Sequence, residues 1–171
     1  MPVASSAASA VHQVPTGALY TLLLLAHVVC AVVGYGAVVV TGYYAGAAAR
    51  GPSGPRADAV YRYFRPGVNW PARALYGVPV FGFALLAASR GAFGSSDAFV
   101  VAGLLLWGVS LIVAEALVWP AERRIQDALS RERPGGELDG GLARDCRTVV
   151  TGSVVLAVAF VVASVLMVGK P

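Results

Sequence analysis

Four long apolar runs, separated by polar or charged connections, dominate the pattern of this chain. They cover residues 17–49, 71–89, 98–119 and 148–168. Because an α-helix rises about 1.5 Å per residue, about 20 apolar residues cross the ~30 Å hydrocarbon layer of a bilayer. The runs have about that length or more. The pattern therefore predicts an all-α polytopic membrane protein, with a tail at residues 1–16 and a domain of four transmembrane helices at residues 17–171.

Local signals mark where two of these helices begin and end. Asn69 precedes the second run and is a good N-cap, and Pro71 is tolerated in the first turn of a helix. Pro79 lies in the middle of the second run and is expected to bend it. After the third run, residues 121–133 continue the helical pattern with charged side chains.

Composition supports a protein that lies in lipid. Hydrophobic residues make up 57% of the chain and charged residues 13%, whereas soluble domains carry about 25% charged residues. The net charge of +4 would fit nucleic acid, but the basic residues lie in the connections between apolar runs. We therefore expect the lipid bilayer, and not nucleic acid, as the main partner.

The placement of the basic residues predicts the orientation. The first and third connections hold eleven of the thirteen Lys and Arg residues, with Arg73 counted at the start of the second helix. Cytoplasmic connections carry the excess of Lys and Arg in membrane proteins. Both basic connections are therefore expected in the cytoplasm and both termini outside. Arg outnumbers Lys twelve to one, which is typical of a GC-rich bacterium, so the expected location is a bacterial plasma membrane.

The first connection contains a short amphipathic segment, predicted to be a helix over residues 57–65. Basic and aromatic side chains together are typical of the headgroup layer of a membrane. The segment is therefore expected at the cytoplasmic membrane surface, through Arg56, Arg62, Arg65, Tyr61, Tyr63 and Phe64.

His27 is the most informative residue for chemistry, because ionisable residues within a span tend to face the bundle interior. Tyr20, His27, Gly34 and Thr41 lie seven residues apart and form one stripe, which Cys30 joins. His27 is either a haem or metal ligand, a proton carrier, or a neutral side chain bonded to another helix. The opposite face is wholly apolar and is expected to meet lipid: Leu22, Leu25, Val29, Val32, Val33 and Val40.

Other polar candidates are few. Glu115 lies near the cytoplasmic end of the third helix, where a carboxylate can pair with an arginine or couple to an ion. His27 and Cys30 are too few ligands for a closed zinc or copper site. A haem with two histidine ligands would need His12 or a histidine of a second chain. No phosphate loop, nucleophile motif, CxxC or HExxH is present, so no enzyme, metal site or cofactor is predicted.

The chain resembles the bacterial four-helix membrane proteins catalogued as domain of unknown function 2269. The features that carry the resemblance are Leu25-Ala26-His27-Val28, the glycines Gly34 and Gly36, the Arg-rich first connection, and Trp-Pro-Ala-Glu-Arg-Arg at residues 119–124. The resemblance implies the four-helix topology and brings no activity.

Three functions remain open from the sequence. The first is an accessory or scaffolding subunit, held by helix packing to itself as a homo-oligomer or to a larger membrane complex. The second is a small redox protein that binds haem or a metal through His27. The third is a small ion or solute transporter that uses His27 and Glu115.

Overall fold

The structure, a computed structural model, describes residues 17–51, 55–89, 92–94, 96–131 and 140–169, with the side chains of 55 and 56 left out. The tail at residues 1–16, with His12, lies outside the described residues. Within these ranges every regular element is helical. In chain order they are α1 (Ala18–Ala48), α2 (Pro55–Tyr63), α3 (Trp70–Arg73), the 3-10 turn η1 (Ala74–Tyr76), α4 (Gly77–Ala88), α5 (Ala98–Val113), the π-helical turn η2 (Ala114–Val118), α6 (Trp119–Arg131) and α7 (Gly140–Val168).

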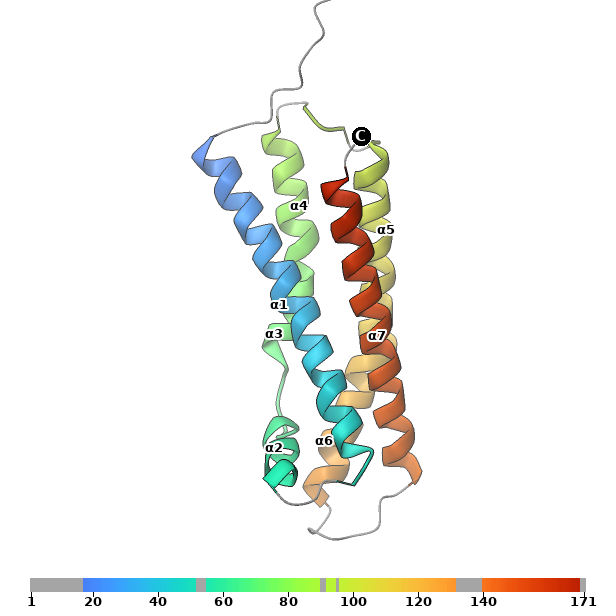
Figure 1. Ribbon diagram of the computed structural model, residues 1–171. Helices are drawn as coiled ribbons and strands as arrows, with labels where there is room; N and C mark the ends of the chain where they lie inside the picture. The colour runs from blue at the N-terminus through green and yellow to red at the C-terminus, as the bar shows by residue number, and fades with distance from the viewer. Residues whose placement is uncertain (1–16, 52–54, 90–91, 95, 132–139, 170–171) are drawn as a thin grey trace, which may run out of the picture.

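These elements form four stretches that are long and apolar enough to cross a membrane, so the predicted all-α four-helix membrane bundle is confirmed. α3, η1 and α4 together make the second stretch, and α5, η2 and α6 make the third. The start of α1 and the end of α7 lie at one end of the bundle, and α2 and the end of α6 lie at the other (Figure 1). We call the second end the basic end, because both arginine-rich connections lie there.

Two boundaries differ from those expected. The short helix of the first connection covers Pro55–Tyr63, two residues earlier than predicted. α7 begins at Gly140, so residues 140–147 are helical although the sequence placed them in a connection. Leu142, Cys146 and Val149 are buried along this part of α7, which packs against α6. These three residues lie four and three positions apart, so they share one face of the helix. Their burial against α6 stabilises helical structure before the apolar run begins, although charged residues stand between them in the sequence.

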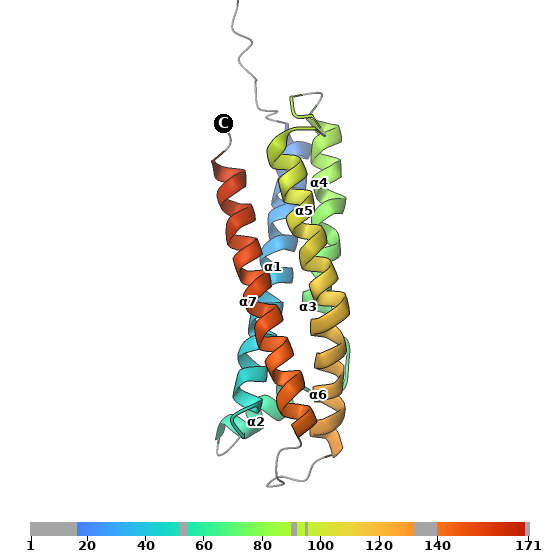
Figure 2. The same ribbon diagram turned by 90° about the vertical axis from the view of Figure 1, so that its right-hand side faces the viewer.

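α1 and α7 cross closely in the half of the bundle near the basic end (Figure 2). The Ser153 hydroxyl lies 2.9 Å from the Val38 carbonyl and 2.7 Å from the Val149 carbonyl, so it bonds both helices. A Cβ atom added at Gly42 would lie 2.5 Å from the Cβ of Ser153. Two carbon atoms cannot approach so closely, so one of the two helices would have to move. Small residues therefore bring these two helices together, as helix packing in lipid requires.

Pro79 leaves a carbonyl without its helical partner, and a neighbouring helix supplies one. Proline has no backbone N–H, so the Leu75 carbonyl, four residues earlier, has no hydrogen bond from position 79. The indole N–H of Trp107 on α5 donates to this carbonyl at 2.9 Å. The irregular turn of the span is η1, three to five residues before Pro79, in the turn from which the proline removes a hydrogen bond. A bend of the helix at Pro79 stays a prediction.

Candidate functional site

The densest group of polar side chains lies near the basic end, where α1, the α2–α3 connection and α6 meet. Asn69 is its centre. Its Nδ2 donates to Oγ1 of Thr41 and to Oε1 of Glu122, each at 3.1 Å. Its Oδ1 accepts the backbone N–H of Ala72 at 3.4 Å, which confirms the predicted N-cap. Every polar atom of this amide therefore has a partner, and one side chain joins three segments of the chain.

Thr41 completes its hydrogen bonds within the same group. Its hydroxyl donates to the Ala37 carbonyl at 3.0 Å, a bond within α1. Its oxygen can then only accept, so the Tyr63 hydroxyl, 2.6 Å away, is the donor. Burial raises the pKa of the Tyr63 phenol, the bond to Thr41 lowers it, and the nearby Glu122 carboxyl raises it further. The phenol therefore keeps its proton at neutral pH and can serve as this donor.

Glu122 is the functional residue that sequence reasoning missed, because it was counted with the charged third connection. It is only 5% exposed, and its Oε1 accepts the hydrogen bond from Asn69. A buried carboxylate is costly unless it is paired and hydrogen-bonded. A signal was available in the sequence: the positions at helical spacing that α6 buries are Trp119, Glu122, Ile125, Gln126 and Leu129.

Arg73 forms a second polar group one level further from the basic end. Its guanidinium carbon lies 3.5 Å from the centroid of the Trp119 ring, a cation–π contact, and its Nη1 lies 3.9 Å from Oε2 of Glu115. The Tyr76 hydroxyl donates to the other oxygen of Glu115. The expected pairing of Glu115 with an arginine is therefore present, and it joins the second and third spans. The indole N–H of Trp119 is buried and has no hydrogen-bond partner among the described residues.

The turn that carries Glu115 is η2, a π-helical turn directly before Trp119 and Pro120. Single π-turns inside α-helices are rare and often lie at functional sites. Glu115 in this turn and Trp119 directly after it both contact the second span: Arg73 lies against both side chains, and Tyr76 binds Glu115 and packs against the Trp119 ring.

The part of the stripe with His27 and Cys30 faces α4, which confirms that His27 points toward another helix. Nδ1 of His27 lies 2.8 Å from the Val78 carbonyl, which can only accept, so this nitrogen carries the proton. Gly82 faces the same imidazole, and Gly77 faces the Cys30 thiol. Tyr20 is partly exposed near the start of α1.

Every residue predicted on the opposite, apolar face of α1 is exposed on the bundle surface: Leu22, Leu25, Val29, Val32, Val33 and Val40.

His27 and Glu115 are not brought together. His27 contacts the span at residues 78–82, whereas Glu115 contacts it at residues 73–76. Within the part of the chain that the structure describes, no group of three or more His, Cys, Asp and Glu side chains is arranged to hold a metal ion.

The aromatic members of the predicted surface group of α2 divide between core and surface. Phe64 is 2% exposed and belongs to the core, so its assignment to the lipid interface is corrected. Tyr63 is half-buried and stacks on Tyr44 with ring centroids 4.3 Å apart. α2 therefore packs Tyr63 against α1. The composition of the segment predicts its aromatic residues but not which of them face the bundle.

The basic members of this group remain exposed where they are described. Arg62 and Arg65 are exposed and Tyr61 is partly exposed, whereas the side chain of Arg56 lies outside the described residues. Contact of these residues with headgroups stays a prediction.

Comparison with known proteins adds no relative: no family model, no curated protein and no solved structure matches this chain.

Proposed function

We propose that the chain is an accessory or scaffolding subunit of a membrane complex, without enzymatic activity of its own. The observation that carries the proposal is the use of its polar side chains within the spans. The most buried of them bond backbone carbonyls or one another across helices, and these bonds hold the bundle together.

The bonds lie at several depths along the bundle. His27 bonds the Val78 carbonyl, Trp107 bonds the Leu75 carbonyl, and Ser153 bonds the Val38 carbonyl. Ser110 donates to Leu106 within its own helix, and Asn69 joins Thr41 to Glu122. A transport path needs polar groups that line a route through the membrane. Groups engaged in interhelical bonds favour a structural role.

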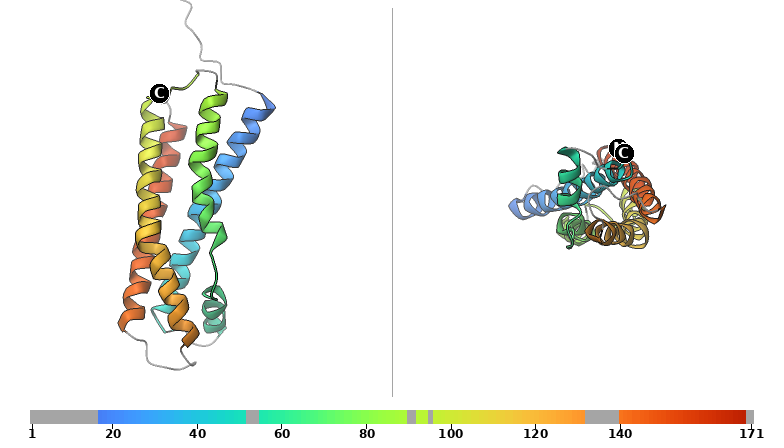
Figure 3. Two further views of the ribbon diagram at one scale, coloured as in Figure 1. Left: turned by 180° about the vertical axis from the view of Figure 1, so that it is seen from behind. Right: turned by 90° about the horizontal axis from the view of Figure 1, so that it is seen from below.

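The first half of α1 supplies a surface that a partner helix can cover. The buried residues of α1 begin at Gly34 and continue to Ala48, and none lies between Ala18 and Val33. The start of α1 tilts away from the other helices, as the view along the bundle axis shows (Figure 3), while His27 and Cys30 keep this half in contact with α4. Its exposed leucines and valines suit lipid and suit an apolar transmembrane helix of a larger complex equally well.

The proposal includes a location and an orientation. The chain would lie in a bacterial plasma membrane with its basic end in the cytoplasm and both termini outside, as the excess of arginine at that end supports. A relationship to the proteins of domain of unknown function 2269 is part of the same proposal and rests on the sequence features alone.

Site-specific photo-cross-linking in native membranes tests the proposal. A photoreactive amino acid replaces Val29, on the exposed face of the first half of α1, or Leu105, an exposed residue of α5 that serves as the matched control. We expect protein adducts of discrete mass from position 29 and only lipid adducts from position 105. Lipid adducts alone from both positions would contradict the scaffolding role of α1.

An absorbance spectrum of the purified wild-type protein distinguishes the scaffolding function from the alternative of a redox protein. Haem or another chromophore bound through His27 would give a visible band that disappears in both His27→Gln and His27→Leu. Such a band, together with only lipid adducts at position 29, would replace the proposed function with the redox function.

A further inference from the structure

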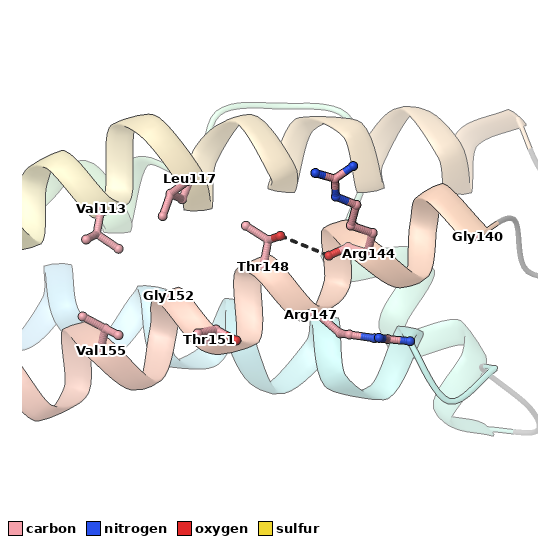
Figure 4. A pocket seen from close by; sticks show the side chains of 9 residues that line it. All are labelled: Val113, Leu117, Gly140, Arg144, Arg147, Thr148, Thr151, Gly152 and Val155. Carbon is pink, nitrogen blue, oxygen red and sulfur yellow. Dashed lines mark hydrogen bonds between the residues drawn. The ribbon is translucent and has the colours of Figure 1, made fainter.

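An elongated groove runs along the outside of the bundle between the third span and α7. It has a volume of about 680 Å³. Val113 and Leu117 point from the third span toward α7, and Val155 lies on the α7 side (Figure 4). Gly152 forms part of its floor, where α7 approaches η2 so closely that an added Cβ atom would meet Val118. The walls of the groove are therefore apolar for most of its length.

The basic end of the groove is charged. Arg144 and Arg147 line it, both with exposed side chains. Figure 4 shows Arg144 directed toward the opposite helix and Arg147 at the other edge of α7, extended along the helix toward the basic end. Within the described residues neither guanidinium forms an ion pair, because the neighbouring Asp145 is bound by Arg124 at 2.8–3.0 Å. Among the described residues, no carboxylate therefore competes with an anion for these two arginines.

The length of the groove matches one leaflet of a bilayer. Its lining on α7 runs from Gly140 to Val155, which corresponds to about 22 Å of helix. Half of a bilayer is about 20–22 Å thick including the headgroup layer. Arg144 lies about 16 Å along the helix axis from Val155, close to the ~15 Å thickness of the hydrocarbon in one leaflet. The charged end therefore falls at the headgroup level when the apolar end reaches the middle of the membrane.

We propose that this groove binds one anionic phospholipid of the leaflet at the basic end. One acyl chain lies against Val113, Leu117 and Val155, and the phosphate lies between Arg144 and Arg147. Charge complementarity and matched length select this ligand, since basic pockets between transmembrane helices bind anionic headgroups. This site is separate from the first half of α1 and does not depend on the identity of any protein partner.

Native mass spectrometry of the full-length protein in detergent tests the site. Dioleoylphosphatidylglycerol and dioleoylphosphatidylcholine are titrated separately, and the dissociation constant of the first bound lipid is measured. We expect tighter binding of the anionic lipid. Replacing both arginines, Arg144→Gln with Arg147→Gln, should weaken that binding about 30-fold, since each arginine near an anionic headgroup contributes about 1 kcal/mol.

Two further variants locate the effect. Arg131→Gln removes an exposed arginine at the end of α6, at the same end of the bundle but outside the groove, and should change the dissociation constant less than threefold. Val155→Trp should weaken binding of the anionic lipid without any change of charge, because the indole fills the apolar part of the groove. Inorganic phosphate at millimolar concentration should not displace the lipid.

Three results would overturn the proposal. They are equal affinity for the two lipids, an equal loss in the arginine double variant and in Arg131→Gln, and full displacement by phosphate. The last result would mean that the arginines bind a free anion and that the apolar groove contributes nothing. A diazirine-labelled phosphatidylglycerol provides an independent measurement: adducts should fall within 113–117 and 148–155, and adducts confined to other segments would also overturn it.

Discussion

Asn69 joins three segments through one amide, so its removal should destabilise the bundle more than the loss of an ordinary polar residue. Asn69→Ala removes the N-cap of α3, which contributes about 1 kcal/mol. It also removes a hydrogen bond to the Glu122 carboxyl and one to Thr41. A bond to a charged group contributes about 1.5–3 kcal/mol and a neutral one about 1 kcal/mol. We expect a total loss of about 3.5–5 kcal/mol, and a smaller loss where Arg73 moves toward Glu122.

Two further substitutions at position 69 separate the contribution of the N-cap from that of the two hydrogen bonds. Asn69→Ser keeps an N-cap oxygen and loses the amide donors, so it should cost about 1 kcal/mol less than Asn69→Ala. Asn69→Asp keeps the cap but places a second carboxylate next to Glu122. Two adjacent carboxylates disfavour the ionised form of each other. This variant should therefore be destabilised at neutral pH and regain stability as the pH falls and one carboxyl takes up a proton.

The assay is unfolding in mixed micelles with increasing sodium dodecyl sulfate, followed by circular dichroism. Ser130→Ala, at an exposed position of α6, is the control and should stay within about 0.5 kcal/mol of wild type. A double-mutant cycle with Glu122→Gln should give a coupling energy of at least about 0.5 kcal/mol, as expected for residues in contact. An Asn69→Ala protein as stable as the control, with no coupling to Glu122, would refute the assignment of Asn69 as the centre of the cluster.

Three further outcomes follow from other parts of the structure. Gly42→Leu should separate α1 from α7 and lower the free energy of unfolding by about 1–3 kcal/mol or more, because the added side chain meets Ser153. Stability equal to wild type would contradict the close crossing of these helices. His27→Leu should lower the free energy of unfolding by about 0.6 kcal/mol, the average for a hydrogen bond within a membrane. His27→Gln should lower it less, because an amide can still donate to the Val78 carbonyl. Losses above about 2 kcal/mol in both variants would indicate a larger role for the imidazole. A single cysteine at Arg62 in a cysteine-free background should react with a membrane-impermeant reagent only after the cells are opened, and reaction in intact cells would reverse the proposed orientation.

The four spans could be predicted from the sequence because apolar length is a strong and local signal. The direction of the α1 stripe could also be predicted, because His27, Gly34 and Thr41 repeat every seven residues on one helix. The partners of these residues could not. His27 bonds a backbone carbonyl on α4, and any residue type at position 78 would present the same group. Contacts to backbone leave no signature in a single sequence.

The polar cluster escaped prediction for a different reason. Glu122 lies in a stretch with many charged residues, and charge is normally a sign of exposure. Its burial depends on what packs against that face of α6, namely the α2–α3 connection with Asn69, which lies far from Glu122 in the sequence. A reading that treats each helix separately therefore places Glu122 on the surface, although the apolar residues around it follow a buried face.

The uneven distribution of burial connects the fold to the proposed function. On α1 the buried residues lie between Gly34 and Ala48, on α7 between Leu142 and Leu156, and α4 has none between Gly77 and Ala88. The tight packing and the Asn69 cluster are thus concentrated at the basic end, and the half that contains the start of α1 and the end of α7 has fewer buried contacts. Regions with few buried contacts open at lower free energy than the rest of a protein. A partner helix along the first half of α1 would add its contacts where the bundle has fewest, while the basic end keeps the four spans in register. An accessory subunit that completes its packing only on assembly is the arrangement that this asymmetry favours.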